Sequence, residues 1–244
     1  MFDHSFLPAT RDQSLGRRLF LRVSAASAAS VALVAAGCTP EAVEPVKVDP
    51  YLLALPAADT GLLYYAYLLA IAQATLYQKV VDAPPADLTA PERAIFADLR
   101  DHEVIYRELF RYSLDPTGAL TLLPTDFKFN LTTFTLSTRA GVLAAAQQLE
   151  DLATAAYPVL LPLFTTAVAT RRTLLLKTAS VHARHAATLR DLAVPGSFAN
   201  DDAVESTGLL AGQARIKTPT EVLAALAPYF APYVISAANL PIPA

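Results

Sequence analysis

The sequence contains 244 residues, of which 54% are hydrophobic and 17% are charged, together with 18 prolines and a single cysteine. This composition excludes a disordered chain, a collagen-like repeat and a disulfide-stapled mini-protein, and a domain of about 200 residues would bury most of its apolar surface. The formal net charge is −3, and the body of the chain carries no basic block with which to contact a phosphate backbone. Nucleic-acid binding is therefore not expected.

The N-terminal segment combines a pair of basic residues with an apolar run. Arg17 and Arg18 precede small and apolar residues that continue to Cys38. The run over residues 23–37 is shorter than the roughly 20 residues with which a helix spans the hydrocarbon core of a membrane. Residues 1–37 are therefore predicted to be a removable signal peptide rather than a permanent anchor.

Two short motifs in this segment resemble known export signals. The residues around Arg17 and Arg18 are similar to a twin-arginine signal, and Ala35-Ala36-Gly37-Cys38 is similar to a lipobox. The resemblance implies that the mature chain begins at a lipid-modified Cys38, which is its link to a membrane. It also implies export by the twin-arginine route to the bacterial cell envelope, on the periplasmic or the cell-surface side.

A stretch with several prolines and alternating charges follows Cys38. Residues 38–57 are expected to be a linker between the lipid and the domain, and residues 58–244 are expected to form one helical domain. Because Cys38 is the only cysteine, the mature protein is expected to contain no disulfide bond.

From residue 58 onward the spacing of apolar residues is helical, and alanine and leucine dominate. Thr218 can cap a short C-terminal helix, since Pro219 suits its first turn and Glu221 completes a capping box. No alternating apolar run is long enough for a sheet, apart from an extended segment around 127–134, so the predicted fold class is all-α. The predicted helices cover residues 58–81, 90–112, 138–165, 167–192 and 219–230.

The lengths of the connections between these helices indicate the topology. The first and second helices, and the third and fourth, are joined by short links, which make them antiparallel neighbours. Residues 113–137 form a much longer connection between the second helix and the third. An antiparallel four-helix bundle with one long crossover is the ferritin-like arrangement, in contrast to the simple up-down bundle.

Each long helix has an apolar seam at alternating three- and four-residue steps, with polar residues only near its middle. Unpaired polar groups in a core cost about 1–3 kcal/mol each, so these side chains must satisfy one another or a bound ligand. The i, i+3 spacing within Glu103/Tyr106 and within His182/His185 puts both members of each pair on one face. The polar layer comprises Gln73, Glu103, Tyr106, Glu150, His182 and His185.

This layer resembles that of the bacterial ferritin-like domain family, which carries Glu, Glu-x-x-His, Glu and Glu-x-x-His on successive helices. The resemblance covers roughly residues 58–230, and Leu149-Glu150-Asp151 and Val181-His182-Ala183-Arg184-His185-Ala186 carry it best. The positions that match the family are Glu103, Glu150 and His185, and the positions that depart from it are Gln73, Tyr106 and His182.

The resemblance implies a two-metal site of which one half is kept. Gln73 and Tyr106 replace the dedicated ligands of the first metal and are expected to be vestigial or to support the site from outside. The remaining two carboxylates and two imidazoles suit one iron, manganese or zinc ion without choosing among them. Tyr106 is expected close enough to be a fifth ligand or a redox-active neighbour. The predicted ligands are Glu103, Glu150, His182 and His185.

The same residues also allow a metal-free interpretation. The two carboxylates would pair with protonated histidines, and the protein would be a non-catalytic structural or interaction lipoprotein with a satisfied polar core. A bundle that binds a small molecule has only the tyrosine-rich first helix in its favour. The sequence does not indicate a homo-oligomer, and a lipid tether argues against an iron-storage cage. His102 lies beside the seam of the second helix. It could donate a hydrogen bond to a ligand of the site, but a histidine in such a flanking position is more often solvated.

Overall fold

The structure is a computed structural model that describes residues 49–119, 123–164 and 169–242, with the side chains of residues 169–171 excepted. The predicted signal peptide, with Arg17, Arg18 and Cys38, lies outside these residues. No helix in the described part of the chain has the length and apolar composition that a membrane crossing needs. The described elements are β1 (Leu52–Ala54), α2 (Ala58–Asp82), α3 (Ala90–Leu114), α4 (Arg139–Leu160), η2 (Leu161–Leu163), α5 (Ala169–Ala193), η3 (Gly208–Leu210), α6 (Pro219–Phe230) and β2 (Val234–Ser236).

Helices α2 to α5 correspond to the four long helices of the prediction, and α6 covers the predicted residues 219–230. The all-α class is thereby confirmed. The predicted end of the third helix at residue 165 is wrong, because α4 ends at Leu160 and is followed by the short 3-10 helix η2. Pro162 lies in η2, and a proline ring clashes with the carbonyl of the fourth residue before it, which ends a regular helix.

Local hydrogen bonds fix where the helices begin. The predicted capping box of α6 is present, with the side chain of Thr218 accepting from the backbone N–H of Glu221. Helix α3 begins with the same motif, formed by Thr89 and Glu92. Such boxes satisfy two of the backbone donors that a helix leaves unpaired at its start.

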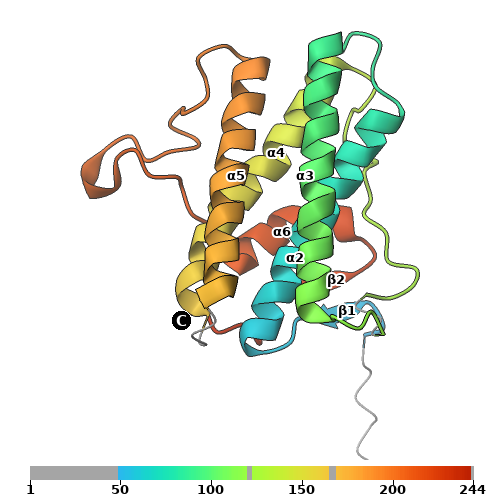
Figure 1. The fold of residues 1–244 in the computed structure, drawn as a ribbon, viewed down its shortest axis with the longest axis vertical. Coiled ribbons are helices and arrows are strands. Elements are labelled where there is room, and N and C mark those ends of the chain that lie inside the picture. Colours follow the sequence, from blue (N-terminus) through green and yellow to red (C-terminus); the bar gives the residue numbers. More distant parts are fainter. Residues whose placement is uncertain (1–48, 120–122, 165–168, 243–244) are drawn as a thin grey trace, which may run out of the picture. The chain divides into compact units, whose positions relative to one another are not determined.

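Figure 1 shows two helical hairpins, α2–α3 and α4–α5, connected by a crossover that returns along the length of the bundle. As a result α3 and α4 run in the same direction, and each is antiparallel to its hairpin partner. The two hairpins contact each other mainly along α2 and α4. This is the ferritin-like topology that the connection lengths predict.

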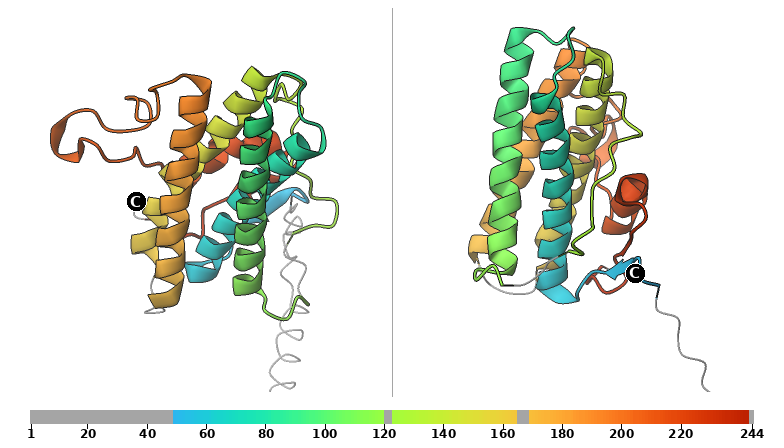
Figure 2. Two further views of the ribbon diagram at one scale, coloured as in Figure 1. Left: turned by 45° about the horizontal axis from the view of Figure 1, so that its top comes forward. Right: turned by 90° about the vertical axis from the view of Figure 1, so that its right-hand side faces the viewer.

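The crossover and α6 share an aromatic cluster on one side of the bundle. In Figure 2 the crossover runs beside α6, and Phe127, Phe129 and Phe134 contact its last turn with ring centroids 4.6 to 5.8 Å apart. Their partners are Tyr229 and Phe230. The segment 127–134 therefore forms turns that present aromatic rings, and the structure assigns it no strand.

A short parallel sheet joins the two ends of the described chain. Leu52 of β1 is paired with Val234 of β2, and Leu55, which follows β1, is only 3% exposed. The Asn239 side chain donates a hydrogen bond to the carbonyl of Leu55 at 3.0 Å. Residues 52–55 fall inside the predicted 38–57 linker, so the packed unit begins before residue 58.

Arg190 near the end of α5 connects the bundle to the projecting segment between α5 and α6. Its guanidinium donates to both carboxylate oxygens of Asp151 on α4, at 2.9 and 2.6 Å, and to both oxygens of Asp202, at 2.9 and 3.0 Å. Paired bonds of this kind fix orientation as well as distance. Since Asp151 follows Glu150 in α4, the same contact helps to hold the α4–α5 hairpin in register at the polar layer.

The Glu92 carboxylate links the start of α3 to Arg139, the first residue of α4, at 2.6 and 2.7 Å. The hydrogen bond with Arg139 is the main reason that the pKa of Glu92 falls to about 2. Its stabilising effect is therefore fully present above the usual pKa of about 4.5 and is lost as the pH falls toward 2.

We expect Glu92→Gln to lower the free energy of unfolding at pH 6 by about 1 kcal/mol. The gap to wild type should close between pH 4.5 and pH 2, as measured by urea denaturation. Glu221→Gln is the matched control, because Glu221 occupies the same capping-box position in α6 and glutamine can keep the capping contact at both sites. A gap of constant size down to pH 2 would show that the ion pair with Arg139 contributes nothing.

Candidate metal centre

Five polar side chains from all four long helices meet in one buried layer of the bundle. Gln73 lies on α2, Glu103 on α3, Glu150 on α4, and His182 and His185 on α5. His185 is 8% exposed and the other four are at most 1% exposed. The predicted seam layer is thus present, with every one of these side chains facing inward.

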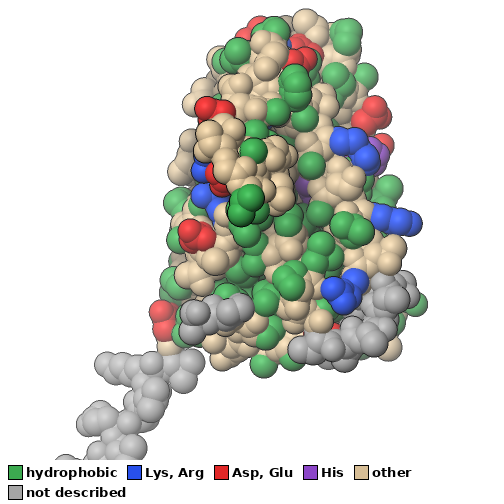
Figure 3. Space-filling model, turned by 90° about the vertical axis from the view of Figure 1, so that its left-hand side faces the viewer, with side chains coloured by type: hydrophobic (Ala, Val, Ile, Leu, Met, Phe, Trp, Pro, Cys, Tyr) green, Lys and Arg blue, Asp and Glu red, His purple; other side chains and the backbone are tan. Residues whose placement is uncertain are grey.

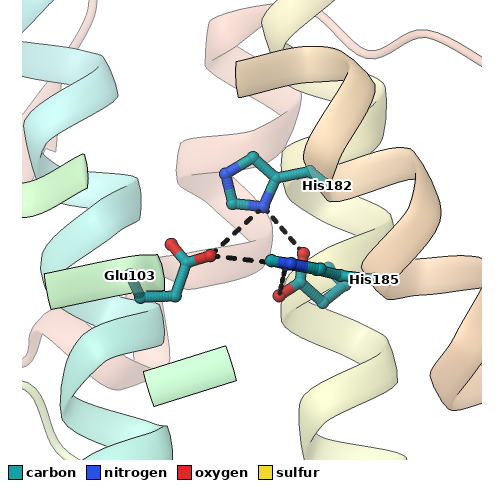
Figure 4. A group of neighbouring side chains, drawn as sticks. Glu103, His182 and His185 are labelled. Carbon is teal, nitrogen blue, oxygen red and sulfur yellow. Dashed lines mark hydrogen bonds and ion pairs between the residues drawn. The ribbon is translucent and has the colours of Figure 1, made fainter. Parts of the chain in front are cut away.

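Figure 4 shows the carboxylate of Glu103 and the rings of His182 and His185 turned toward one another. Nδ1 of His182 lies 2.7 Å from Oε2 of Glu150 and 3.7 Å from Oε1 of Glu103. Nδ1 of His185 lies 3.4 Å from Oε1 of Glu150 and 3.5 Å from Oε1 of Glu103. The two Nδ1 atoms and the two carboxylates therefore face a common point between α3, α4 and α5.

Helix α2 contributes neutral hydrogen-bonding groups to this layer. The hydroxyl of Tyr77 donates to Oε1 of Glu150 at 2.7 Å, and the side-chain nitrogen of Gln73 lies 3.2 Å from Nδ1 of His182. Because Gln73 carries no charge, α2 supplies orientation rather than an anionic ligand. The supporting role of Gln73 in a metal site stays a prediction.

The two carboxylates have opposite electrostatic character. Burial raises the pKa of Glu103, and the charges of the neighbouring histidines do not fully offset it. Burial also acts to raise the pKa of Glu150, but the nearby histidines outweigh burial and hold that pKa at about 2. Glu150 is therefore the more strongly paired carboxylate, whereas Glu103 contacts the two histidines only at 3.7 and 3.5 Å.

The two carboxylates raise the pKa of both histidines. Burial would lower the pKa of His185, but its contacts with Glu103 and Glu150 raise it to about 9. The pKa of His182 is likewise raised by the two carboxylates, against the effect of burial. The layer thus has a net attraction for positive charge, which protons or a cation can satisfy.

Several polar atoms in the described layer have no hydrogen-bond partner: both oxygens of Glu103, Nδ1 of His185, Nε2 of His182 and Oε1 of Gln73. A native protein leaves few such atoms without a reason.

One ligand atom from each of Glu103, Glu150, His182 and His185 lies within 4.8 Å of the other three. Since donors bind zinc at about 2.0–2.2 Å, this donor set fits a single ion with small side-chain adjustments.

Aromatic rings enclose His182. The ring of Tyr157 is stacked on it at a centroid distance of 4.9 Å, and that of Tyr106 lies 5.5 Å away. Tyr106 is half-buried, and burial and the charge of Glu103 raise the pKa of its hydroxyl. The ring of Tyr106 is therefore a neighbour of the layer, as predicted, and its role as a fifth ligand stays a prediction.

Sequence reasoning missed Tyr77, although it lies one turn after Gln73 on the same face of α2, a spacing that places the two side chains together. His102 is exposed, as the sequence favours, and its Nδ1 also lies 3.1 Å from Nε2 of His185. No helical periodicity could have revealed this contact, because it depends on the separation of α3 from α5.

The topology and the buried layer define a ferritin-like four-helix bundle with a carboxylate and histidine centre. A family model described as a ferritin-like domain matches residues 58–194, more than half of the chain, and the chain therefore belongs to this family. No curated protein and no solved structure matches the chain.

The contrast between the carboxylates gives a prediction of sign for the metal-free protein at pH 8. The pKa of Glu103 is raised above 4.5 in the folded protein, which means that folding favours the protonated carboxyl. Any stability that Glu103 contributes is therefore lost as the pH rises through that pKa. Glu103→Gln should therefore increase the free energy of unfolding by about 1 kcal/mol. Glu150→Gln weakens the contacts with His182 and Tyr77 and should decrease it by about 1–3 kcal/mol.

Urea denaturation of both variants in the presence of a chelator checks these signs. Because the two substitutions have identical chemistry in the same buried layer, each variant serves as the control for the other. Equal destabilisation by both would contradict the assignment of Glu103 as the more weakly paired carboxylate.

Proposed function

We propose that the protein is an exported ferritin-like lipoprotein that binds a single transition-metal ion in a half-retained two-metal site. Glu103, Glu150, His182 and His185 would hold the ion, which is iron, manganese or zinc. The observation that carries the proposal is the convergence of four donor atoms within 4.8 Å, together with the lack of a hydrogen-bond partner for either oxygen of Glu103. A buried carboxylate that is paired only at long distance destabilises a fold unless a ligand compensates for it.

The replacements at Gln73 and Tyr106 support one ion rather than two. Gln73 offers a neutral amide in contact with His182, and the phenol of Tyr106 has its pKa raised further above 10. Neither group supplies an anionic ligand near neutral pH. Negative charge in the layer therefore comes from Glu103 and Glu150, which suits one divalent cation.

A bound ion of iron or manganese would supply one-electron redox chemistry at this point, and zinc would supply Lewis acidity. The chain's own groups orient the ligands and exclude water. Tyr77 holds Oε1 of Glu150 by donating to it, and Tyr157 packs against the face of His182. His182, Glu103 and Glu150 have no exposed surface. Bulk solvent therefore reaches the proposed ligands only at His185.

One observation favours the metal-free alternative, in which the protein is a structural or interaction module. The 2.7 Å contact of His182 with Glu150 is already a satisfied ion pair when the histidine is protonated. The two functions require different protonation states of the histidines. The ion pair needs protonated imidazoles, whereas metal ligation requires neutral imidazoles and releases protons. The affinity for a metal ion should therefore fall as the pH falls.

Metal analysis of protein reconstituted separately with iron(II), manganese(II) and zinc tests the proposal. We expect about one ion per chain with at least one of these metals, and a higher melting temperature for the loaded protein. His185→Ala should abolish stoichiometric binding, whereas Thr188→Ala, at an exposed position on α5, should bind as wild type does. Wild-type protein that takes up none of the three metals would leave the metal-free module as the function.

The export and lipidation part of the proposal rests on the sequence of the N-terminal segment. In a bacterial host, Cys38→Ala should leave an uncleaved precursor or release the domain in soluble form, as judged by membrane fractionation and N-terminal analysis. Replacement of both Arg17 and Arg18 by lysine should block export by the twin-arginine route. Unchanged membrane association of the Cys38 variant would refute the lipid anchor, and normal export of the lysine variant would indicate the general secretory route.

A further inference from the structure

His102 connects the buried layer to the surface of the bundle. It precedes the proposed ligand Glu103 on α3, and its own side chain is exposed. Its ring is nearly parallel to that of His185, with an interplanar angle of 4° and a centroid distance of 5.2 Å. Nδ1 of His102 and Nε2 of His185 are 3.1 Å apart. The contact thus joins α3 to α5, which meet less closely than α2 meets α4.

The two nitrogens of His185 face in different directions. Nδ1 lies 3.4 and 3.5 Å from carboxylate oxygens of the buried layer, whereas Nε2 faces His102. A neutral imidazole that binds a cation through Nδ1 has its lone pair there and its proton on Nε2. An acceptor next to Nε2 therefore selects the form of His185 that can bind an ion inside the bundle.

We propose that His102 is a positioning residue of the metal centre, which accepts a hydrogen bond from Nε2–H of His185 and so holds Nδ1 of His185 toward the ion. This inference rests on the proposed function and adds a residue outside the four ligands. Partners of this kind fix the ring orientation and the tautomer of a ligating histidine, and their loss typically reduces metal affinity 10- to 100-fold.

The position of His102 also marks the side from which the centre meets solvent. Among the four proposed ligands only His185 has any exposed surface, and it is 8% exposed. Figure 3 shows histidine side chains at the surface on the face that carries α5, and His182 is fully buried. The ring of His102 contacts His185, the one proposed ligand that has exposed surface.

Two substitutions separate the hydrogen bond from the contact between the two rings. His102→Phe keeps an aromatic ring against His185 but has no acceptor, and His102→Asn keeps an acceptor near the place of Nδ1 but has no ring. In competition with a chromogenic chelator, His102→Phe should bind zinc about 10- to 100-fold more weakly than wild type, and His102→Asn should remain within about threefold. Ile105→Phe is the matched control, because Ile105 is 60% exposed on the same helix and the change also adds a surface ring.

Long-range ¹H–¹⁵N correlation spectra of the zinc-loaded protein provide a second measurement that a merely structural role would not change. Wild type and His102→Asn should show Nδ1 of His185 bound to zinc and Nε2 protonated, whereas His102→Phe should lose this single form. Zinc on Nε2 of His185 in wild-type protein would overturn the inference even without any variant.

The outcomes distinguish this inference from the function on which it rests. Wild-type protein that binds no zinc, iron or manganese overturns both, since His102 would then have no ion to serve. Wild-type protein that binds zinc with an affinity equal to that of His102→Phe overturns the role of His102 alone. Circular dichroism of each variant establishes that the bundle is folded, as expected for changes at an exposed position.

Discussion

The burial of two carboxylates and two imidazoles at the centre of the bundle is the constraint on which the rest of the structure depends. Removal of such groups from water costs several kcal/mol for each ion, and only contacts with opposite charge or with a bound cation offset it. Glu150 has these contacts, because His182 and Tyr77 lie within hydrogen-bond distance of it. Glu103 has only the longer ion pairs with His182 and His185, at 3.7 and 3.5 Å, and neither of its oxygens has a hydrogen-bond partner. Under the proposed function, a bound cation would compensate for the burial of this carboxylate.

The architecture places these four groups together with little dependence on loops. Two antiparallel hairpins bring the middles of four helices to the same height, and a rigid helix carries every donor. The crossover between α3 and α4 makes these two helices run in the same direction, and both Glu103 and Glu150 lie within 3.7 Å of His182 and His185. Arg190 and Arg139 then tie the helices to each other near and beyond this layer.

The site is asymmetric, and the asymmetry has a functional meaning. Helix α2 supplies only neutral groups, since Gln73 and Tyr77 orient the ligands of α4 and α5. The negative charge is confined to the α3 and α4 side of the layer. A bundle that served only as a stable surface module would be more stable with apolar residues at these positions, and the full burial of Glu103 is the feature that supports the proposed ligand. Proteins commonly accept such a loss of stability at functional sites.

The sequence by itself determined the helices and the polar layer, because both follow from local geometry. The 3.6-residue period places Gln73, Glu103, Glu150, His182 and His185 on inward faces, and the capping residue Thr218 fixes the start of α6.

Only the tertiary structure decided which side-chain atoms of different helices contact one another. The separation of α3 from α5 brings His102 to His185, the pairing of β1 with β2 joins residues far apart in the chain, and the unequal surroundings of the two carboxylates set their opposite pKa shifts. Distances between helices depend on how each helix is rotated and packed against its neighbours, which hydrogen bonds within one helix do not specify.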